Sequence, residues 1–309
     1  MSDRRPGRLG VGVVGAGRVG SVLGSALRAA GHAVVGASAI SDASLERAAS
    51  LLPGVPVLEV EEVVERAELV LVTVPDDALP TLVAGVAKVG GWQPGQLVVH
   101  TSGRFGTAVL EPAFRAGAIP LAIHPAMTFT GTSLDLARLE GTTFAVTAPG
   151  AVLPIGQALV VEIGGEPVVV DEAARPLYHA ALAHGADHLV VLVAQAAQAL
   201  EAAGVEHPGR LLQPLLSATL DGATRAADTR EDGVGPGAVA ALSGAVPAGD
   251  AATVAAHTDA LAALAASTGA TDVPASYAIL TRAAVRRALA AHRIDERTAR
   301  TLLDTLDVP

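Results

Sequence analysis

The stretch GVGVVGAGRVG at residues 10–20 constrains the fold of this chain more than any other part of it. Its first half is a short valine-rich run, typical of a buried β-strand, and an apolar helical pattern continues to about Ala30. Between the two lie glycines with the spacing G-x-G-x-x-G, at Gly15, Gly17 and Gly20. The pattern predicts a strand, a tight glycine loop and a helix in immediate succession.

This loop has the properties of a dinucleotide-binding site. The first glycine permits the tight turn, the second lets the backbone approach a pyrophosphate, and the third lets the helix pack against the strand. The helix would offer its unpaired N–H groups and the positive end of its dipole to the phosphates. A plain glycine-rich turn is the alternative, but a second strand pattern at residues 33–38 follows at the expected distance. We therefore expect the whole loop, including Arg18 and Val19, to bind the cofactor.

The end of the second strand bears on which cofactor is bound. It ends near Ser38 without the Asp or Glu that usually binds the ribose 2′-hydroxyl of NAD. Ser38 and Ser41 fit the small polar residues of NADP sites, although no arginine stands beside them. Asp42 is the competing carboxylate, but it fits better as part of the first turn of the next helix, where acidic residues are favoured. The sequence favours NADP(H) over NAD(H).

The remainder of the first half alternates strand and helix patterns. Strands are expected near Val57 and at residues 68–74, 97–99, 121–123, 142–147 and 166–170. This alternation predicts an α/β domain of the Rossmann type with a parallel sheet. Because ligands bind outside the carboxyl ends of such strands, Thr73, Val74 and Pro75 should border the cofactor.

Two later strands are followed by side chains that could contact a substrate. One strand runs into His100-Thr101-Ser102-Gly103 and the other into His124-Pro125. Each histidine alone could be an ordinary loop residue. Together, at two strand ends beside one cofactor, they make Ser102 and His124 candidates to hold a substrate oxygen.

Beyond residue 170 the sequence contains only helical patterns rich in Ala and Leu. They cover residues 172–203, 208–226, 234–242, 250–267, 271–292 and 295–305. The first would be about 48 Å long at about 1.5 Å per residue, enough to cross one domain and reach the next. We therefore expect a dinucleotide-binding domain at residues 1–170 and an all-α domain for substrate binding and dimerisation at residues 171–309.

Composition narrows the class of partner. The formal charge is −10, which disfavours nucleic acid and anionic membranes because both select clustered Lys and Arg. The chain has no cysteine, which excludes disulfides, thiolate nucleophiles and cysteine-ligated zinc. The charged start MSDRRPGR lacks a signal-peptide pattern, and the apolar run at residues 188–200 is short for a membrane span. We expect a cytoplasmic protein with a small-molecule substrate.

The first helix of the second half carries the polar residues that could do chemistry. His184 and His188 lie four residues apart on one face, with Asp187 beside them. Two histidines are too few for a metal site, and no H-E-x-x-H motif is present. A histidine titrates near neutrality, and the only lysine, Lys88, is far away in sequence. We expect His184 to donate a proton and Asp187 to orient it, with solvated surface histidines as the alternative.

Several motifs together resemble a known family. They are GAGRVG at residues 15–20, VTVPDD at 72–77, HTSG at 100–103, HPAMTFTG at 124–131, HGADHL at 184–189, LLSATLDGA at 215–223 and LSGAVPAGDAATVAAH at 242–257. As a set they are similar to Rossmann-like proteins with a C-terminal domain of unknown function, DUF2520. These are relatives of the 6-phosphogluconate and β-hydroxyacid dehydrogenases.

The resemblance implies an oxidoreductase that uses NADP(H), and similarity to ketopantoate reductases suggests a small carbonyl or imine substrate. Two features depart from the relatives. The wider superfamily has a lysine and an asparagine on the long helix, where this chain has no lysine and has Asp187. The loop from Ser243 to Asp250 lacks the arginine that relatives often carry.

Two classes of function follow. The first is an NADPH-preferring reductase of a small carbonyl or imine, with a ketopantoate-like 2-oxo acid as the leading analogy. The second is a nucleotide-sensing or scaffold protein that kept the fold and lost the chemistry. In both cases the weakly charged helices predict a homodimer formed through the C-terminal half.

Overall fold

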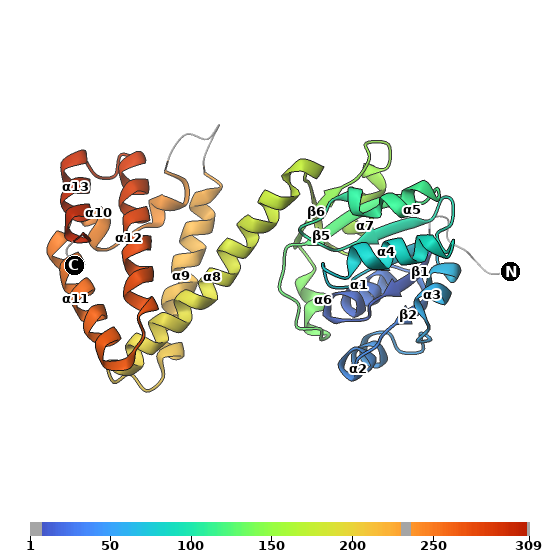
Figure 1. Cartoon of the computed structure of the whole chain (residues 1–309), viewed down its shortest axis with the longest axis horizontal. Helices are drawn as coiled ribbons and strands as arrows, with labels where there is room; N and C mark the ends of the chain where they lie inside the picture. Colours follow the sequence, from blue (N-terminus) through green and yellow to red (C-terminus); the bar gives the residue numbers. More distant parts are fainter. Residues whose placement is uncertain (1–7, 230–235, 308–309) are drawn as a thin grey trace. The chain divides into compact units, whose positions relative to one another are not determined.

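The computed structural model describes residues 8–229 and 236–307. They divide into two compact units, residues 1–185 and 186–309. The first, coloured from blue to green in Figure 1, contains a β-sheet. The sheet has seven strands in the order β2-β1-β3-β4-β5-β6-β7. The strands are β1 (Gly10–Val14), β2 (Ala33–Ser38), β3 (Leu69–Val72), β4 (Leu97–His100), β5 (Ile119–Pro125), β6 (Thr143–Thr147) and β7 (Glu166–Val169).

Helices cover both faces of this sheet, because its central strands are apolar on both sides. Strands β3 and β4 are entirely buried, as the continuous apolar runs of parallel sheets require. One face packs against α1 (Arg18–Ala29), α2 (Asp42–Leu51), α6 (Leu134–Arg138) and α7 (Leu153–Glu162). The other packs against α3 (Val60–Arg66), α4 (Leu79–Lys88) and α5 (Glu111–Arg115), the last preceded by the 3-10 helix η1 (Thr107–Leu110).

The expected α/β fold with a following helical region is confirmed, with one difference in the sheet. Strands β2, β1, β3, β4 and β5 are parallel, but β6 pairs antiparallel with β5, and β7 is parallel to β6. The chain turns back at the carboxyl end of β5, where Pro125 is paired with Phe144. The connection from β5 to β6 contains only the short α6, which does not carry the chain back to the other end of the sheet. Strand β6 therefore starts where β5 ends and runs antiparallel to it.

A smaller difference concerns the strand expected near Val57. Here the structure has only an isolated bridge between Ala37 and Val57, and the chain then enters α3. Pro56 contributes to this result, since it has no backbone N–H to donate to a longer ladder.

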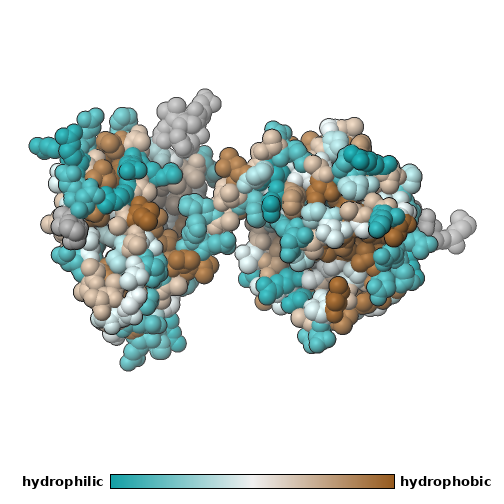
Figure 2. Space-filling model, in the orientation of Figure 1, coloured by the Kyte–Doolittle hydropathy of each residue, from teal (hydrophilic) through white to brown (hydrophobic). Residues whose placement is uncertain are grey.

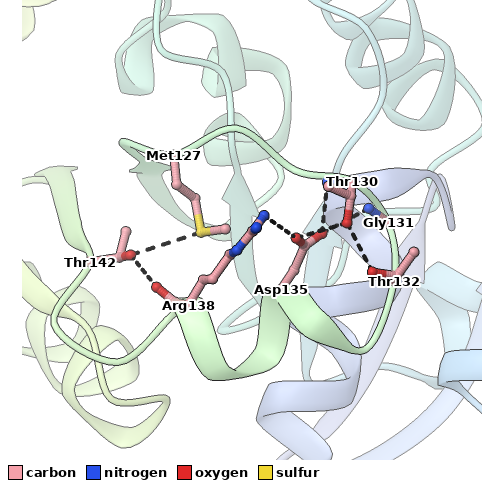
Figure 3. Close-up of polar contacts among 7 residues, drawn as sticks. All are labelled: Met127, Thr130, Gly131, Thr132, Asp135, Arg138 and Thr142. Carbon is pink, nitrogen blue, oxygen red and sulfur yellow. Dashed lines mark hydrogen bonds and ion pairs between the residues drawn. The ribbon is translucent and has the colours of Figure 1, made fainter. Parts of the chain in front are cut away.

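The return from β5 to β6 is organised by one buried carboxylate, that of Asp135 (Figure 3). It accepts hydrogen bonds from the backbone N–H of Thr130 and Gly131, at 2.8 and 2.7 Å, and from the Thr130 hydroxyl at 2.9 Å. Arg138 approaches the same carboxylate at 3.5 Å, with a side chain 58% exposed. Burial alone would raise the pKa of Asp135, but the hydrogen bonds outweigh it and lower that pKa.

In its described residues, the second unit has helices as its only regular structure. Its elements are the C-terminal part of α8 (Arg175–Ala202), then α9 (Pro208–Ala227), the 3-10 helix η3 (Gly237–Ala241), α10 (Ala245–Ala248), α11 (Ala251–Thr268), α12 (Asp272–Ala290) and α13 (Glu296–Thr305). Their core is made of small aliphatic side chains, including Val254, Val285 and Leu302, all fully buried. Of the helix expected at 234–242, residues 234 and 235 lie outside the described residues, and most of the remainder forms η3.

Helix α8 belongs to both units. A 3-10 turn, η2 (Glu172–Ala174), leads directly into it. The boundary that we expect at residue 170 follows the last strand, whereas the compact units divide inside α8 at Gly185. In the described part of the chain, the segment Glu172–Ala202 is the one helix long and apolar enough to cross a membrane, by length and composition alone. One such helix is weak evidence for a membrane span.

We predict that Asp135→Asn destabilises the first unit. At pH 7 the free energy of unfolding should fall by about 1–3 kcal/mol, because charge-assisted hydrogen bonds to a buried group are lost. The folded-state pKa of Asp135 is lowered, so its stabilisation is present above the unfolded pKa, near 3.8, and disappears as the pH falls through the folded value. Urea unfolding followed by the fluorescence of the buried Trp92 should show the difference at pH 7 and a smaller one at pH 3.

The matched control is Arg138→Ala, which removes the exposed partner of the same carboxylate. It should change the unfolding free energy by less than about 0.5 kcal/mol. Equal stability of Asp135→Asn and the unmodified protein at pH 7 would contradict the prediction.

Candidate functional site

The glycine loop after β1 is held by its neighbours in the sheet. Gly15 has φ +93°, a conformation that glycine adopts without strain. Its N–H donates to the Ser38 hydroxyl at 3.0 Å, and its carbonyl accepts from the Thr73 hydroxyl at 2.6 Å. The ends of β2 and β3 therefore fix the loop between them. Ser38 and Thr73, expected to border a cofactor, lie at the loop and support its backbone.

The other two glycines have different surroundings. A Cβ at Gly20 would clash with the Gly15 carbonyl and the Thr73 hydroxyl, so only glycine permits this contact between helix and loop. A Cβ at Gly17 would meet nothing within 4 Å. Gly17 precedes α1 and faces open space at its N-terminus, where an anion would be stabilised. These observations fit the distinct roles of the second and third glycines of a dinucleotide loop.

A cavity of about 580 Å³ lies at the carboxyl end of β2. Its lining runs from Ser38 to Ile40 and from Val57 to Val60, with Glu62. Ile40 is 97% exposed there, an unusual position for a large aliphatic side chain. The size fits the adenosine end of a dinucleotide, and the lining combines aliphatic side chains with the carboxylates of Glu59 and Glu62.

Residues beyond β2 supply polar groups near this end of the sheet. Ser41 caps α2 by accepting a hydrogen bond from the Ser44 N–H, and Asp42 lies in the first turn of that helix, as expected. Arg47, on α2, is a further residue here that was not among those expected from the sequence. The Nε of Arg47 and the Cγ of Arg18 both lie within about 3 Å of where a Gly131 Cβ would stand. Two arginines therefore adjoin the loop that Asp135 holds.

The second group of polar residues lies at the carboxyl ends of β4 and β5. His100 is fully buried, donates from Nε2 to the Gly106 carbonyl at 2.8 Å and accepts at Nδ1 from the Ser102 N–H at 3.2 Å. Burial lowers the pKa of His100 to about 4, so the ring is neutral. The Ser102 hydroxyl accepts from the N–H groups of Arg104 and Phe105. Its own proton remains available for donation.

Arg175, in the first turn of α8, is buried beneath these residues with none of its surface exposed. Its Nε donates to the Thr147 hydroxyl at 2.8 Å, and Nη2 donates to the carbonyls of Ala122 and Ala145 at 2.9 and 3.0 Å. Nη1 makes a longer contact of 3.4 Å with the Ser102 carbonyl. No carboxylate within ion-pair distance of Arg175 occurs in the described residues. The guanidinium therefore brings to the strand ends a positive charge that no ion pair neutralises, with only the more distant Glu172 carboxylate attracting it.

His124, at the end of β5, is paired with Tyr178 on α8. Its Nδ1 lies 2.8 Å from the Tyr178 hydroxyl, and the two rings meet edge to face with centroids 5.6 Å apart. Burial, followed by the nearby charges of Arg175 and His179, lowers the pKa of His124 to about 4. A Cβ at Gly103 would stand 2.9 Å from the His124 Nε2 and from the His179 Cδ2. His124, Tyr178, His179 and Gly103 therefore converge on one place in the first unit.

The remaining expected residues are more dispersed. His184, Asp187 and His188 occupy exposed positions on α8, with His184 in the first compact unit and Asp187 in the second. In the loop from Ser243 to Asp250, the Asp250 carboxylate caps α11 by accepting from the N–H and hydroxyl of Thr253. Within the described ranges, no cluster of three or more potential metal ligands is formed.

The structure therefore adds Arg175, Tyr178 and His179 to the site expected from sequence. A signal for two of them was available. Arg175 is a lone cation near the start of an apolar helix, and Tyr178 is one of only two tyrosines in the chain. Neither fact alone predicts which residue the side chain contacts, because His124 is 54 residues away from Tyr178 in sequence.

Comparison with known proteins agrees with this architecture. A family model for a Rossmann-like domain matches residues 1–125, and the model for a domain of unknown function, DUF2520, matches residues 142–284. No curated protein matches the sequence significantly.

Three solved structures are similar over nearly the whole chain. A Bacteroides fragilis protein, provisionally assigned as an NADP oxidoreductase, has a TM-score of 0.68 and 19% identity over 90% of this chain and 98% of its own. An imine reductase from a Pseudomonas species has a TM-score of 0.62 and 18% identity over 97% and 99%. An imine reductase from Myxococcus stipitatus in complex with NADP⁺ has a TM-score of 0.61 and 20% identity over 95% and 99%.

At such identities the likeness supports the fold alone. The two family models account for most of the chain: the first ends with β5, and the second begins just before β6. The chain is therefore a Rossmann-like protein with a C-terminal DUF2520 domain.

Proposed function

We propose that this protein is an NADPH-preferring oxidoreductase that reduces a small carbonyl or imine compound. One observation carries the proposal: the glycine cradle and the His124–Tyr178 pair lie at the carboxyl end of the same sheet. Ligands of open α/β sheets bind along this edge. A cofactor and a substrate could therefore meet there.

The cofactor assignment is supported by the residues that would hold it. Gly15, Gly17 and Gly20 would receive the pyrophosphate at the start of α1, and the cavity beyond Ser38 would receive the adenosine. Strand β2 ends at Ser38 instead of the Asp or Glu that is usual in NAD sites, although Glu59 and Glu62 line the cavity beyond it. Arg18 and Arg47, which lie against Gly131, add positive charge that favours a 2′-phosphate. The bound cofactor would supply the hydride. The similar Myxococcus stipitatus imine reductase is an NADP⁺ complex, which is consistent with this choice.

The substrate would be held by residues of this chain. Ser102 and His124 would bind the carbonyl oxygen, and His184, oriented by Asp187, would donate the proton. A 2-oxo acid of the ketopantoate type is the leading analogy, from the resemblance of the sequence motifs. An imine is the alternative, in keeping with the two imine reductases among the similar structures. A nucleotide sensor would bind NADPH without oxidising it in the presence of any such compound.

The first test concerns the cofactor. Gly17→Asp should abolish NADPH binding, because its carboxylate would take the place of the pyrophosphate and repel it. The fold should be retained, since the added side chain starts in open space. Gly17→Ala is the matched control and should weaken binding much less. Calorimetric titration measures both, and tighter binding of NADH than NADPH would contradict the cofactor preference.

The second test concerns the proton donor. His184→Gln should leave NADPH affinity within about twofold and lower turnover by about 10²-fold or more, since general acid catalysis typically contributes about 10²- to 10⁴-fold. Stopped-flow oxidation of NADPH in the presence of candidate carbonyl compounds gives both quantities. Unchanged turnover would remove His184 from the mechanism.

The third test concerns assembly. We propose a homodimer formed through the helical unit, because apolar side chains are exposed on α8, α9 and α12, among them Val190 at 69%, Leu215 at 57% and Ile279 at 67%. Brown, apolar patches are visible on the helical unit in Figure 2. Such surfaces are uncommon on monomers and typical of interfaces. Light scattering at micromolar concentration should give twice the chain mass of 30.8 kDa.

Val190→Asp should shift this mass toward that of a single chain. Val161→Asp, at a site 60% exposed on α7 in the first unit, should not. A single-chain mass for the unmodified protein, or its partition into neutral lipid vesicles, would contradict the dimer.

A further inference from the structure

The hydrogen bond between His124 and Tyr178 has a direction that the surroundings decide. The imidazole is neutral near pH 7, so it carries one proton, either on Nδ1 or on Nε2. Nδ1 is the nitrogen 2.8 Å from the phenol oxygen. If Nδ1 carried the proton it would donate to the phenol, and if Nε2 carried it the phenol would donate to Nδ1.

The properties of the Tyr178 phenol favour the arrangement in which Nε2 carries the proton and the phenol donates to Nδ1. Burial raises the pKa of Tyr178, so its hydroxyl keeps its proton. Among the described residues, His124 is the one hydrogen-bond partner of that hydroxyl. A donated bond to Nδ1 uses the phenol proton, whereas the reverse arrangement would leave it without a protein acceptor in a half-buried place.

Burial, together with most of the charged groups around His124, keeps its ring uncharged. Arg175 and His179, both on α8, and His100, at the end of β4, disfavour an imidazolium, while Asp76, after β3, favours one. Burial is the largest influence and acts with the first group. His124 is therefore suited to donate a hydrogen bond without giving up a proton.

The other ring nitrogen faces a space that only glycine leaves open. A Cβ at Gly103 would stand 2.9 Å from the His124 Nε2, closer than real side chains approach. The Ser102 hydroxyl belongs to the same turn, and its proton is not used by the hydrogen bonds it accepts. A proton on Nε2 would therefore point toward the turn that also carries the Ser102 hydroxyl.

We propose that Tyr178 is a positioning residue that holds His124 as its Nε2–H tautomer, so that the uncharged imidazole donates a hydrogen bond to a substrate oxygen. This arrangement selects a carbonyl compound over a preformed iminium ion, because the iminium nitrogen has no lone pair to accept the bond. The choice of substrate class rests on the proposed function. The tautomer does not, since it is a property of the chain alone.

Nitrogen NMR of the full-length protein, labelled with ¹⁵N-histidine and free of cofactor, measures the tautomer at pH 7. The His124 signals are identified by their loss in His124→Gln. We expect Nδ1 to resonate as an unprotonated nitrogen and Nε2 as a protonated one. In Tyr178→Phe the two signals should move toward each other, because both tautomers become populated. A protonated Nδ1 in the unmodified protein, or unchanged signals in Tyr178→Phe, would overturn the proposal.

The chain contains a matched control for this variant. In the helical unit, Tyr277 pairs with His257 in the same way, with Nδ1 3.0 Å from the hydroxyl and ring centroids 5.8 Å apart at 84°. Tyr277→Phe should leave the His124 signals unchanged while altering those of His257. Amide spectra of each variant verify that the fold is intact.

A kinetic comparison then tests the substrate class. With a ketone or aldehyde substrate, Tyr178→Phe should lower kcat by about tenfold and leave NADPH affinity unchanged, as expected for loss of one oriented donor. Turnover of a preformed cyclic iminium should be affected less than twofold. An equal fall in kcat with the carbonyl and the iminium substrate would overturn the proposal that this site selects carbonyl compounds. Failure to bind NADPH would overturn the proposed function but would not alter the tautomer.

Discussion

The buried guanidinium of Arg175 joins more parts of the first unit than any other side chain described here. It donates to backbone carbonyls of β5 and β6 and contacts the Ser102 carbonyl after β4, while itself belonging to the first turn of α8. A buried cation without a carboxylate is costly, and the cost is offset only because nearly every N–H finds an acceptor. The start of α8 is thereby fixed against the strand ends. Tyr178, one turn later, is consequently held beside His124.

The same charge influences the chemistry of the site. A cation near two histidines opposes their protonation, and burial acts in the same direction for both. For His100 the result is structural, because both ring nitrogens are engaged within its own loop. For His124 one nitrogen is engaged by Tyr178, and the other faces the open position at Gly103. Two similar histidines therefore acquire different roles from their hydrogen-bond partners.

Two loops at the carboxyl end of the sheet are each held in place by side-chain hydrogen bonds. The glycine loop is braced by Ser38 and Thr73, whose hydroxyls contact its backbone. The loop after β5 is braced by Asp135, whose carboxylate accepts its N–H groups. Gly131 in this second loop lies against Arg47 and Arg18, so the positions of the arginines depend on a carboxylate remote from them in sequence. Three side chains, those of Ser38, Thr73 and Asp135, thus fix the backbone of both loops.

The sequence by itself determined the glycine loop and the succession of elements apart from the strand expected near Val57, because hydrophobic periodicity and φ requirements are local properties. It also located Ser102 and His124 at strand ends. The tertiary structure decided the antiparallel return of β6, the burial of Arg175 and the pairing of His124 with Tyr178. These depend on contacts between residues many positions apart, such as the 54 that separate His124 from Tyr178. Protonation and hydrogen-bond direction follow from such contacts, because desolvation and nearby charge exist only once the chain is folded.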